Sequence, residues 1–479
     1  MDFSRMTVRT RHPSVLVAVL AAAGISVSLT QTLIVPIIPE LPAMLGADSA
    51  NASWAVTATL LAAAVATPLY GRFGDLYGPR RMLIICALAL AAGSLICALS
   101  DSLAPFVAGR ALQGLGMPIV PLGISVLRSS VPPDRVGSAM GVMSSSLGVG
   151  GAMGLPLSAI IVQHTHWHAL FWLATGLGAL ATVLFATLVP PVPAVSTGRF
   201  DPLGTVLLTA GLLALLLPIS KGASWGWGSP LTVGMFVASA VIFAVFALWQ
   251  LKIPSPIVDL RTTFRRPVLL TNLASVSMGF AWFTLMLVSP QVLELPTSLE
   301  HGLGQSLIAT GLWMAPGGLA MMVFSSVSAA VAKRRGPKFT LVLGCAIIAA
   351  SFLAGPWLLG SAPLVMLLGI IVSVGVGFGF AALPALINAA VPITETAAAN
   401  GINALARSLG TSISSTVMTA ILTAMVVWAP ATADAPAHPV PSAAGFTAAL
   451  LVAGAVALVA TVLAMLIPDP IAALRDEPA

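Results

Sequence analysis

The sequence predicts an all-α protein that crosses a membrane many times. Mean hydropathy is +1.02, and of the 479 residues 58% are hydrophobic and only 8% are charged. Apolar runs of about 20 residues recur along the chain, and each is long enough to cross a hydrocarbon core of ~30 Å as a helix. The runs lack the alternation of a membrane β-barrel, so helices are the expected spanning elements.

Division of the chain at clusters of proline, glycine and charge predicts fourteen spanning helices. Their expected ranges are 15–37, 52–71, 82–100, 105–127, 138–162, 168–189, 203–220, 230–251, 268–293, 306–331, 339–358, 362–388, 400–427 and 443–467. The first run begins at Val15 and leads into Pro36 and Pro39 without a small-residue cleavage site. We therefore interpret it as a retained helix and not as a signal peptide.

The positions of Lys and Arg predict the orientation, because positive charge collects in cytoplasmic loops. With the N-terminus inside, all of the 21 Lys and Arg fall on the cytoplasmic side except Lys221, which falls outside, and Arg110 and Arg407, which lie within helices. We expect a multi-pass protein of the cell membrane (the inner membrane, where there are two) with both tails, 1–14 and 468–479, in the cytoplasm. The net charge of +6 is then orientation charge, and no nucleic-acid partner is expected.

An internal repeat predicts two related halves. Two pairs of segments match, GPRRMLII (78–85) with GPKFTLVL (336–343) and SSVPPDRVGSAMGVMSSSLG (129–148) with AAVPITETAAANGINALARSLG (389–410). The spacing predicts six-helix halves at 15–189 and 268–467, with two inserted helices and their loops at 190–267. Both copies begin on the same side, as in secondary transporters whose substrate site lies between two halves.

The segment GRFGDLYGPRR, residues 71–81, concentrates charge and glycine in an apolar chain. We expect it to be the cytoplasmic turn between the second and third helices. One interpretation is a charged hairpin that only orients these helices. The other is a functional contact, since Gly71, Gly74 and Gly78 permit close backbone approach and positive φ. Asp75 lies among three arginines and is placed for a charge-assisted clasp near a helix end.

This segment resembles the loop signature of the major facilitator superfamily. The pattern Gly-x-x-x-Asp-x-x-Gly-x-Arg-Arg is matched at Gly71, Asp75, Gly78, Arg80 and Arg81. The resemblance implies a latch on the cytoplasmic gate, whose charges stabilise the outward-facing state.

Three more segments extend the resemblance to the fourteen-helix drug:proton antiporter branch of that superfamily. GRALQGLG (109–116) resembles the helix 4 signature of the superfamily through Arg110 and Gln113. QVLEL (291–295), which contains Glu294, and residues 304–318 resemble the corresponding region of proteins in this branch. The resemblance implies that the matching arginine helps proton coupling, so Arg110, Gln113 and Glu294 are the candidate coupling residues. From the sequence alone, Arg110 either faces a cavity or partner or extends to the outer interface.

The fifth expected helix contains GVGGAMGLPLSA (148–159), which is similar to the helix 5 antiporter signature through Gly150, Gly154 and Pro156. Small residues allow tight helix packing in membranes, and an internal proline removes a backbone hydrogen bond and bends a helix. Packing alone accounts for these residues, and the resemblance adds that the bend controls leak and export direction.

The first helix departs from the branch, which usually has Leu-Asp-x-Thr where this chain has Leu29-Thr30-Gln31-Thr32. None of the Asp and Glu residues falls near the middle of an expected span, so substrates are expected to be neutral or weakly charged hydrophobic molecules. The candidate substrate-binding residues are Thr30, Gln31, Trp282, Phe283, Asn403 and Arg407. For Trp282 and Phe283, in the expected helix 268–293, the alternative is lipid contact or packing. For Arg407 the alternative is extension to the cytoplasmic interface.

Together these features predict a secondary active transporter, not an enzyme, that exports hydrophobic drugs or antibiotics by proton antiport with alternating access. Its expected partners are a small hydrophobic substrate, protons and the lipid bilayer, and it is expected to work as a monomer. The histidines of HTHWH (164–168) make a weak metal motif, so no metal and no cofactor is expected. The alternatives are a transporter of a specific metabolite and, in another class, a membrane-embedded enzyme or receptor.

Overall fold

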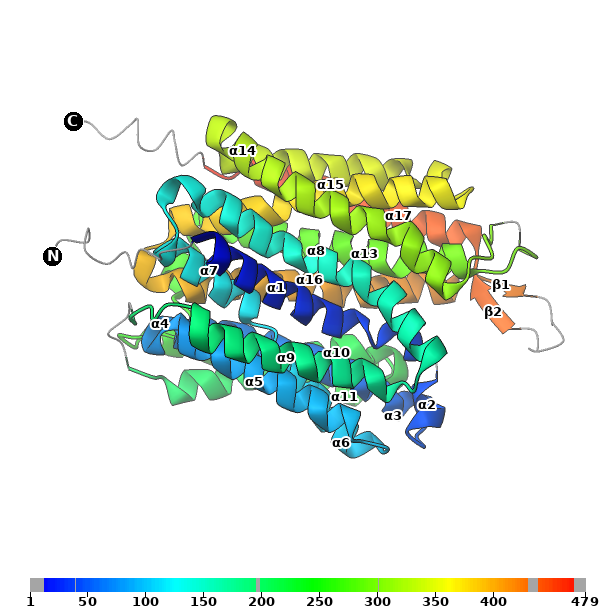
Figure 1. Ribbon diagram of the computed structural model, residues 1–479, viewed down its shortest axis with the longest axis horizontal. Coiled ribbons are helices and arrows are strands. Elements are labelled where there is room, and N and C mark those ends of the chain that lie inside the picture. The colour runs from blue at the N-terminus through cyan, green and yellow to red at the C-terminus, as the bar shows by residue number, and fades with distance from the viewer. Residues whose placement is uncertain (1–12, 39, 195–198, 300, 430–437, 469–479) are drawn as a thin grey trace.

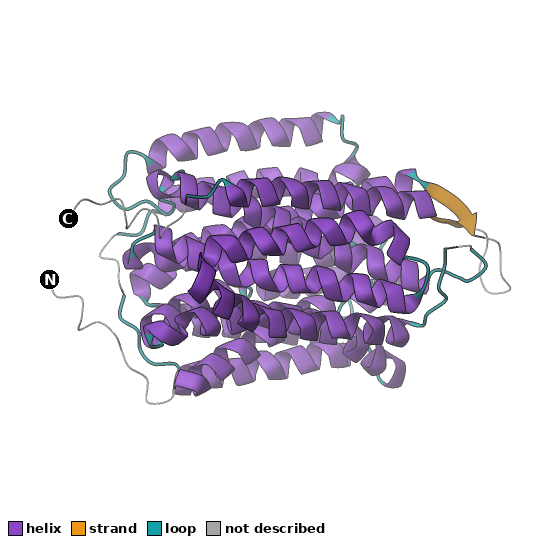
Figure 2. Ribbon diagram, turned by 90° about the horizontal axis from the view of Figure 1, so that it is seen from above, coloured by secondary structure: helices purple, strands orange, loops and turns teal. Residues whose placement is uncertain are grey.

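The computed structural model describes residues 13–38, 40–194, 199–299, 301–429 and 438–468. Long helices roughly parallel to one axis dominate the fold (Figures 1 and 2). Before residue 190 the helices are α1 (Pro13–Thr32), η2 (Val35–Ile37), α2 (Leu41–Met44), α3 (Ser49–Ala52), α4 (Trp54–Tyr77), α5 (Pro79–Ala98), α6 (Leu103–Leu115), α7 (Ile119–Ser130), α8 (Pro133–His164) and α9 (His168–Leu188). The elements after it are α10 (Pro202–Trp225), α11 (Pro230–Gln250), α12 (Leu260–Thr263), α13 (Arg266–Glu294), α14 (Leu307–Ala354), η3 (Gly355–Leu358), α15 (Ala362–Ala390), η4 (Ile393–Glu395), α16 (Thr396–Ala424), β1 (Val426–Ala429), β2 (His438–Pro441) and α17 (Ala443–Met465).

Three expected boundaries are wrong. The expected turn at 71–81 is almost wholly helical, because α4 continues to Tyr77, α5 begins at Pro79, and Gly78 alone reverses the chain with φ +93°. The expected helix 105–127 is divided into α6 and α7. The end of the expected helix 400–427 is a strand, since β1 pairs antiparallel with β2.

Twelve helical segments of the described chain are long and apolar enough to cross a membrane. One of them, Leu307–Leu358, contains Gly336, whose φ of +83° and ψ of 157° are not helical, so this segment holds two helices. Helix α16 has 29 residues but is not among the twelve, since Asn400, Asn403 and Arg407 are among the polar residues that lower its hydropathy. The chain is therefore a polytopic α-helical membrane protein.

The helices before residue 190 and those after residue 265 have separate buried cores. Representative side chains of the first are Leu20, Leu83 and Phe185, and of the second Leu341, Phe352 and Phe446. A further cluster joins Leu212 of α10 and Phe246 of α11 to Leu61 of α4 and Leu405 of α16. The inserted helices α10 and α11 therefore pack against both groups of helices at once.

The two groups of helices meet along two lines of contact, which we call the α4–α16 seam and the α8–α14 seam. A Cβ on Gly401 of α16 would lie 2.8 Å from the carbonyl oxygen of Thr67 in α4. In the second seam, a Cβ on Gly141 of α8 would lie 3.0 Å from the carbonyl oxygen of Ser325 in α14. Glycine at these positions lets the helix backbones approach closely.

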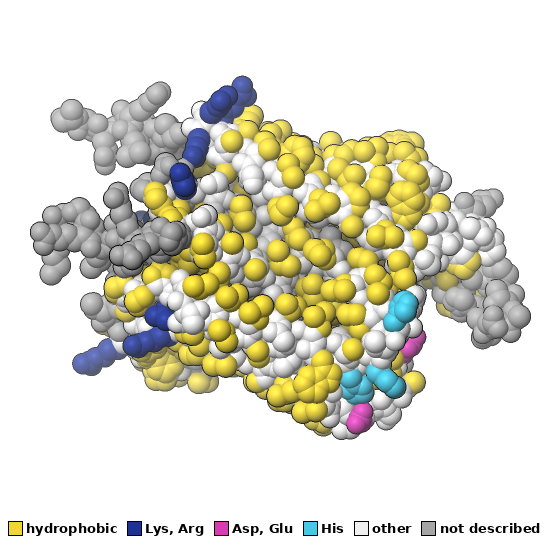
Figure 3. Space-filling view, viewed as in Figure 1, with side chains coloured by type: hydrophobic (Ala, Val, Ile, Leu, Met, Phe, Trp, Pro, Cys, Tyr) yellow, Lys and Arg dark blue, Asp and Glu magenta, His cyan; other side chains and the backbone are white. Residues whose placement is uncertain are grey.

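Charge is distributed unevenly along the long axis of the bundle. On the face seen in Figure 3, Lys and Arg gather at one end, and His with Asp and Glu at the other, with apolar side chains between. We call the first the basic end; α1 begins there, and the β1–β2 hairpin projects from the opposite end (Figure 1).

Candidate functional site

Asp75 joins the two groups of helices at the basic end. It lies in the last turn of α4 and its side chain is only 1% exposed. Its carboxylate oxygens accept hydrogen bonds from the backbone N–H groups of Ala397 (3.1 Å) and Ala398 (2.9 Å) in the first turn of α16. A carboxylate is favoured there because the first N–H groups of a helix lack partners within the helix and the helix dipole is positive at that end.

Two glycines allow α4 to come this close. A Cβ on Gly71 would lie 2.6 Å from the carbonyl oxygen of Ala397, and one on Gly74 would lie 2.7 Å from Leu122 and 3.5 Å from the Ala397 side chain. The glycines of the segment thus have different roles. Gly71 and Gly74 allow α4 to contact neighbouring helices, and Gly78 makes the turn.

The expected clasp between Asp75 and its neighbouring arginines is not made by Arg80 or Arg81, and Arg72 attracts the Asp75 charge without a direct hydrogen bond to it. Arg80 turns away and donates hydrogen bonds to the carbonyl oxygens of Ala186 (2.5 Å) and Phe185 (3.4 Å) in α9, while Arg81 is exposed. Asp75 takes its hydrogen bonds from the backbone of α16, because the helix start offers two oriented donors without the cost of ordering a long side chain.

Arg128 makes a second contact between the groups of helices, and sequence reasoning missed it. From the last turn of α7 it donates to the carbonyl oxygen of Asn388 (2.7 Å) and to the hydroxyl of Thr396 at the start of α16. The amide of Asn400 then donates to the Asn388 side chain (2.7 Å). A signal was available, because Arg128 and Asn388 are 260 residues apart, which are matching positions of the repeat predicted from the sequence.

Arg110 lies inside the protein, so the alternative of extension to the outer interface is wrong. It is 2% exposed. Its guanidinium donates to the carbonyl oxygen of Ala55 (2.9 Å) and to the side-chain oxygen of Gln113 (2.6 Å). The Gln113 amide in turn donates to the Ser94 hydroxyl (2.8 Å). Arg110 and Gln113 thus form one buried network in α6, whereas Glu294 is exposed at the end of α13 in the other group of helices.

The residues of the α8 motif face two different helices. Gly150 lies against the backbone of Ile25 in α1, and Gly154 lies against Thr32 of the same helix. Pro156 instead faces α14, where a Cβ on Gly311 would lie 2.8 Å from the proline ring. The motif therefore holds α1 and α14 close to α8 on two of its sides.

The six candidate substrate-binding residues lie in different places. Thr30 is buried and donates a hydrogen bond to the Ser26 carbonyl of its own helix (2.8 Å), while Gln31 is half-buried. Trp282, half-buried in α13, lies between the groups of helices, with its ring 3.4 Å from where a Cβ on Gly151 of α8 would be. Phe283 is half-buried in the same helix.

Asn403 and Arg407 belong to the polar face of α16. The Asn403 amide donates to the Asn272 side chain of α13 (3.0 Å), and the Ser275 hydroxyl donates to the Asn403 carbonyl (3.1 Å). The Arg407 guanidinium lies over the Phe380 ring of α15, 4.9 Å from its centre, in a cation–π contact.

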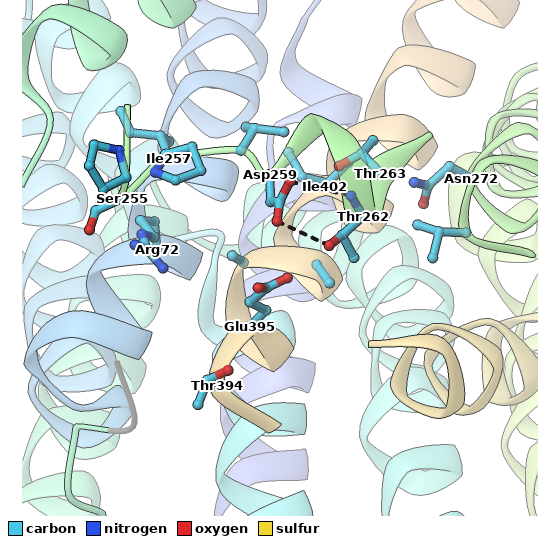
Figure 4. Close-up of a pocket in the computed structure, with 16 residues that line it drawn as sticks. Arg72, Ser255, Ile257, Asp259, Thr262, Thr263, Asn272, Thr394, Glu395 and Ile402 are labelled. Carbon is cyan, nitrogen blue, oxygen red and sulfur yellow. Dashed lines mark hydrogen bonds between the residues drawn. The ribbon is translucent and has the colours of Figure 1, made fainter. Parts of the chain in front are cut away.

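A cavity of about 310 Å³ lies at the α4–α16 seam (Figure 4). The segment between α11 and α13, α13 itself and the start of α16 also line it. Its charged and polar side chains are those of Arg72, Ser255, Asp259, Thr262, Thr263, Asn272, Thr394 and Glu395. This cavity could not be predicted from the sequence, because its lining comes from four segments that are far apart in the chain.

A bundle of long apolar helices whose two groups meet along extended seams is the architecture of a membrane transporter. The profile of the Major Facilitator Superfamily matches residues 20–415, and the chain belongs to this superfamily. The family and the fold are those of transporters, which in general are not enzymes.

Several relatives are similar over most of the chain. The uncharacterized MFS-type transporter YhcA of Bacillus subtilis is 25% identical over 424 residues, which cover 85% of this chain and 77% of YhcA. The tetracenomycin C resistance and export protein of Streptomyces glaucescens is 29% identical over 333 residues, which cover 69% of this chain and 61% of that protein. The lincomycin resistance protein LmrB of Bacillus subtilis is 25% identical over 332 residues, covering 69% of this chain and 68% of LmrB.

A solved structure has the same fold. The human organic anion transporter MFSD10 (TETRAN) superposes with a TM-score of 0.68 at 15% identity, covering 95% of this chain and all of that structure. At this identity the likeness concerns the fold alone.

Proposed function

We propose that this protein exports hydrophobic drug-like or antibiotic molecules across the cell membrane in exchange for protons. The observation that carries the proposal is the Asp75 contact, in which α4 of one half caps the first turn of α16 in the other. Such a contact stabilises one arrangement of two halves that rock against each other. The printed names of the relatives from Streptomyces glaucescens and Bacillus subtilis support a drug-like cargo.

The topology that we propose has fourteen crossings and a cytoplasmic basic end. Helix α14 then crosses twice, once on each side of Gly336, and the polar α16 crosses once. A basic end in the cytoplasm agrees with the usual excess of Lys and Arg there. Both tails would then be cytoplasmic; most of residues 1–14 and 468–479 lie outside the described chain. The halves are residues 15–189 and 268–467, with 190–267 inserted.

Neutral or weakly charged hydrophobic molecules are the proposed substrates, and the transporter acts as a monomer. Thr30 stands where the related branch has an acid, and its hydroxyl is satisfied within α1. Of the six candidate residues, Trp282 is the best placed, because it lies between the halves. Protons then require a group away from the helix centres, for which Asp75, Glu40, Glu294 and Glu300 are candidates; Glu300 lies outside the described residues.

The test is drug susceptibility and intracellular accumulation in cells that lack their own exporters and express this chain. Expression is expected to raise resistance to neutral hydrophobic antibiotics and to lower their accumulation, with little effect on quaternary ammonium dyes. Asp75→Asn at matched membrane expression is the control for protein-dependent transport. Equal accumulation with and without the chain, across the antibiotic series, would contradict the proposal.

A further inference from the structure

The cavity at the α4–α16 seam is lined by two opposite charges, Arg72 and Glu395, and both feel the charge of nearby Asp75, which attracts Arg72 and repels Glu395. Arg72 of α4 is 8% exposed and Glu395, at the start of α16, is half-buried, and both line the cavity. Neither side chain makes a hydrogen bond or an ion pair within the described structure. The Asp75 carboxylate is already hydrogen-bonded to the backbone of α16, so the donor groups of Arg72 and the oxygens of Glu395 keep free hydrogen-bonding capacity within the described structure. Each group is therefore suited to a ligand that brings the opposite charge and makes the direct contact.

The remaining lining favours a small amphipathic occupant. Ile257, Val258 and Ile402 supply aliphatic surface, and Asn272, 8% exposed, reaches the cavity with its amide N–H groups free of described partners. Asp259 is already occupied as the cap of α12, since its oxygens accept from the backbone of residues 261 and 262 and from the Thr262 hydroxyl. A volume of about 310 Å³ is at the lower end of ligand-binding cavities.

The segment 254–263, which lines one side of the cavity, is held in place by a hydrogen-bond network of the inserted helices α10 and α11. Asp201, at the start of α10, accepts hydrogen bonds from Trp249 (3.0 Å) and from the Gln250 amide (2.8 Å) at the end of α11. The Gln250 side-chain oxygen then accepts from the backbone N–H of Ile257 (2.8 Å), which lines the cavity. The segment 254–263 is thus fixed over the seam by the inserted pair.

We propose that this cavity binds a small aliphatic zwitterion, with its carboxylate on Arg72 and its ammonium group on Glu395, and that the bound molecule holds the gate closed. Arg72 belongs to one half and Glu395 to the other, so the site exists complete only while α4 and α16 are together. A ligand that binds one arrangement better than another shifts the population toward it. The second part of the inference rests on the proposed alternating access.

The first experiment measures binding to the purified full-length protein in lipid nanodiscs by calorimetry. The probes are ω-amino acids from 4-aminobutyrate to 8-aminooctanoate, with hexanoate and hexylamine as single-charge controls. At least one ω-amino acid is expected to bind more tightly than either control. Arg72→Gln and Glu395→Gln should each weaken it by about tenfold or more, since each removes one charge pair. Arg261→Gln is the matched control, because Arg261 is exposed and does not line the cavity.

Ser255→Trp is a second way to block the site, used in case the charge variants do not fold. Ser255 lies in the segment between α11 and α13, and a large ring there fills the cavity without removing a charge. This variant should also abolish binding. Absence of binding throughout the series, or equal affinity in the wild type and both charge variants, overturns the site.

The second experiment measures drug uptake into inside-out membrane vesicles, where the basic end faces the medium. The best-binding ω-amino acid should slow uptake by the wild type and leave Glu395→Gln unaffected. Uptake by the wild type that is insensitive to saturating ligand contradicts the coupling to the gate. If the wild type shows no uptake at all, the proposed function fails, while the binding result stands by itself.

Discussion

Replacement of Asp75 by Asn should open the basic end of the bundle. The substitution keeps the shape of the side chain but replaces a carboxylate that accepts from Ala397 (3.1 Å) and Ala398 (2.9 Å) with a neutral amide. One charge-assisted hydrogen bond is lost, because the amide NH2 group then faces a backbone N–H and two donors cannot pair. The other hydrogen bond is weakened and the favourable interaction of the charge with the start of α16 disappears, at a cost of about 2–4 kcal/mol to the closed arrangement. At about 1.4 kcal/mol per factor of ten, the ratio of closed to open protein falls about 30- to 700-fold.

The measurement is the distance between spin labels on Tyr77→Cys and Thr394→Cys, which are exposed and lie on opposite sides of the α4–α16 seam. The native cysteines are fully buried, so labelling at the introduced sites is selective. Asp75→Asn should add a population at longer distance, and it should also reduce transport strongly at equal expression. An unchanged distance distribution together with near-normal efflux would refute the latch.

Three further predictions concern other parts of the molecule. Arg110→Lys should reduce transport about tenfold or more, measured as efflux at equal expression, because one ammonium group does not reproduce the forked contact made by the guanidinium. Gly401→Ala should weaken the closed seam by about 1–3 kcal/mol through overpacking, seen as lower efflux, whereas Gly360→Ala, with nothing within 4 Å, should not. Ser224→Cys should react with an impermeant thiol reagent in intact cells and Ser255→Cys should not.

Each of these has an outcome that counts against it. Full activity of Arg110→Lys would mean that charge alone suffices at that position. Equal effects at Gly401 and Gly360 would mean that the seam tolerates a methyl group. Protection at Ser224 with labelling at Ser255 would overturn the fourteen-crossing topology.

The helical character of the chain was predictable from composition, because long apolar runs leave a membrane protein few alternatives. The ends of the helices and the roles of single glycines were harder to predict. Gly78 was recognisable as a turn residue, yet α4 runs up to it, since the glycines at 71 and 74 serve helix packing and not chain reversal. A glycine is compatible both with a turn and with close helix packing. The role of Gly71 and Gly74 follows from their contact with α16, which the sequence does not show.

The partners of candidate site residues depended on contacts between segments far apart in the chain. Asp75 could be selected as a candidate site residue from the sequence. Its partners could not be predicted, because they are backbone N–H groups more than 300 residues away, and any residue type except proline supplies such a group. Arg110 was ambiguous because its depth depends on α4 and α5 packing around it. Arg128 was overlooked as an ordinary cytoplasmic charge, although it matches Asn388 in the predicted repeat and contacts it across the two groups of helices.

The most direct test of the account is uptake of a labelled neutral antibiotic, beginning with tetracenomycin C, into proteoliposomes that contain only this protein in inside-out orientation. With an acidic lumen, uptake above protein-free liposomes is expected, because protons leave as the substrate enters. A protonophore should abolish this uptake, and Asp75→Asn should reduce it strongly. Uptake no greater than in protein-free liposomes across a series of neutral hydrophobic antibiotics would contradict the account, as would uptake that is indifferent to the proton gradient.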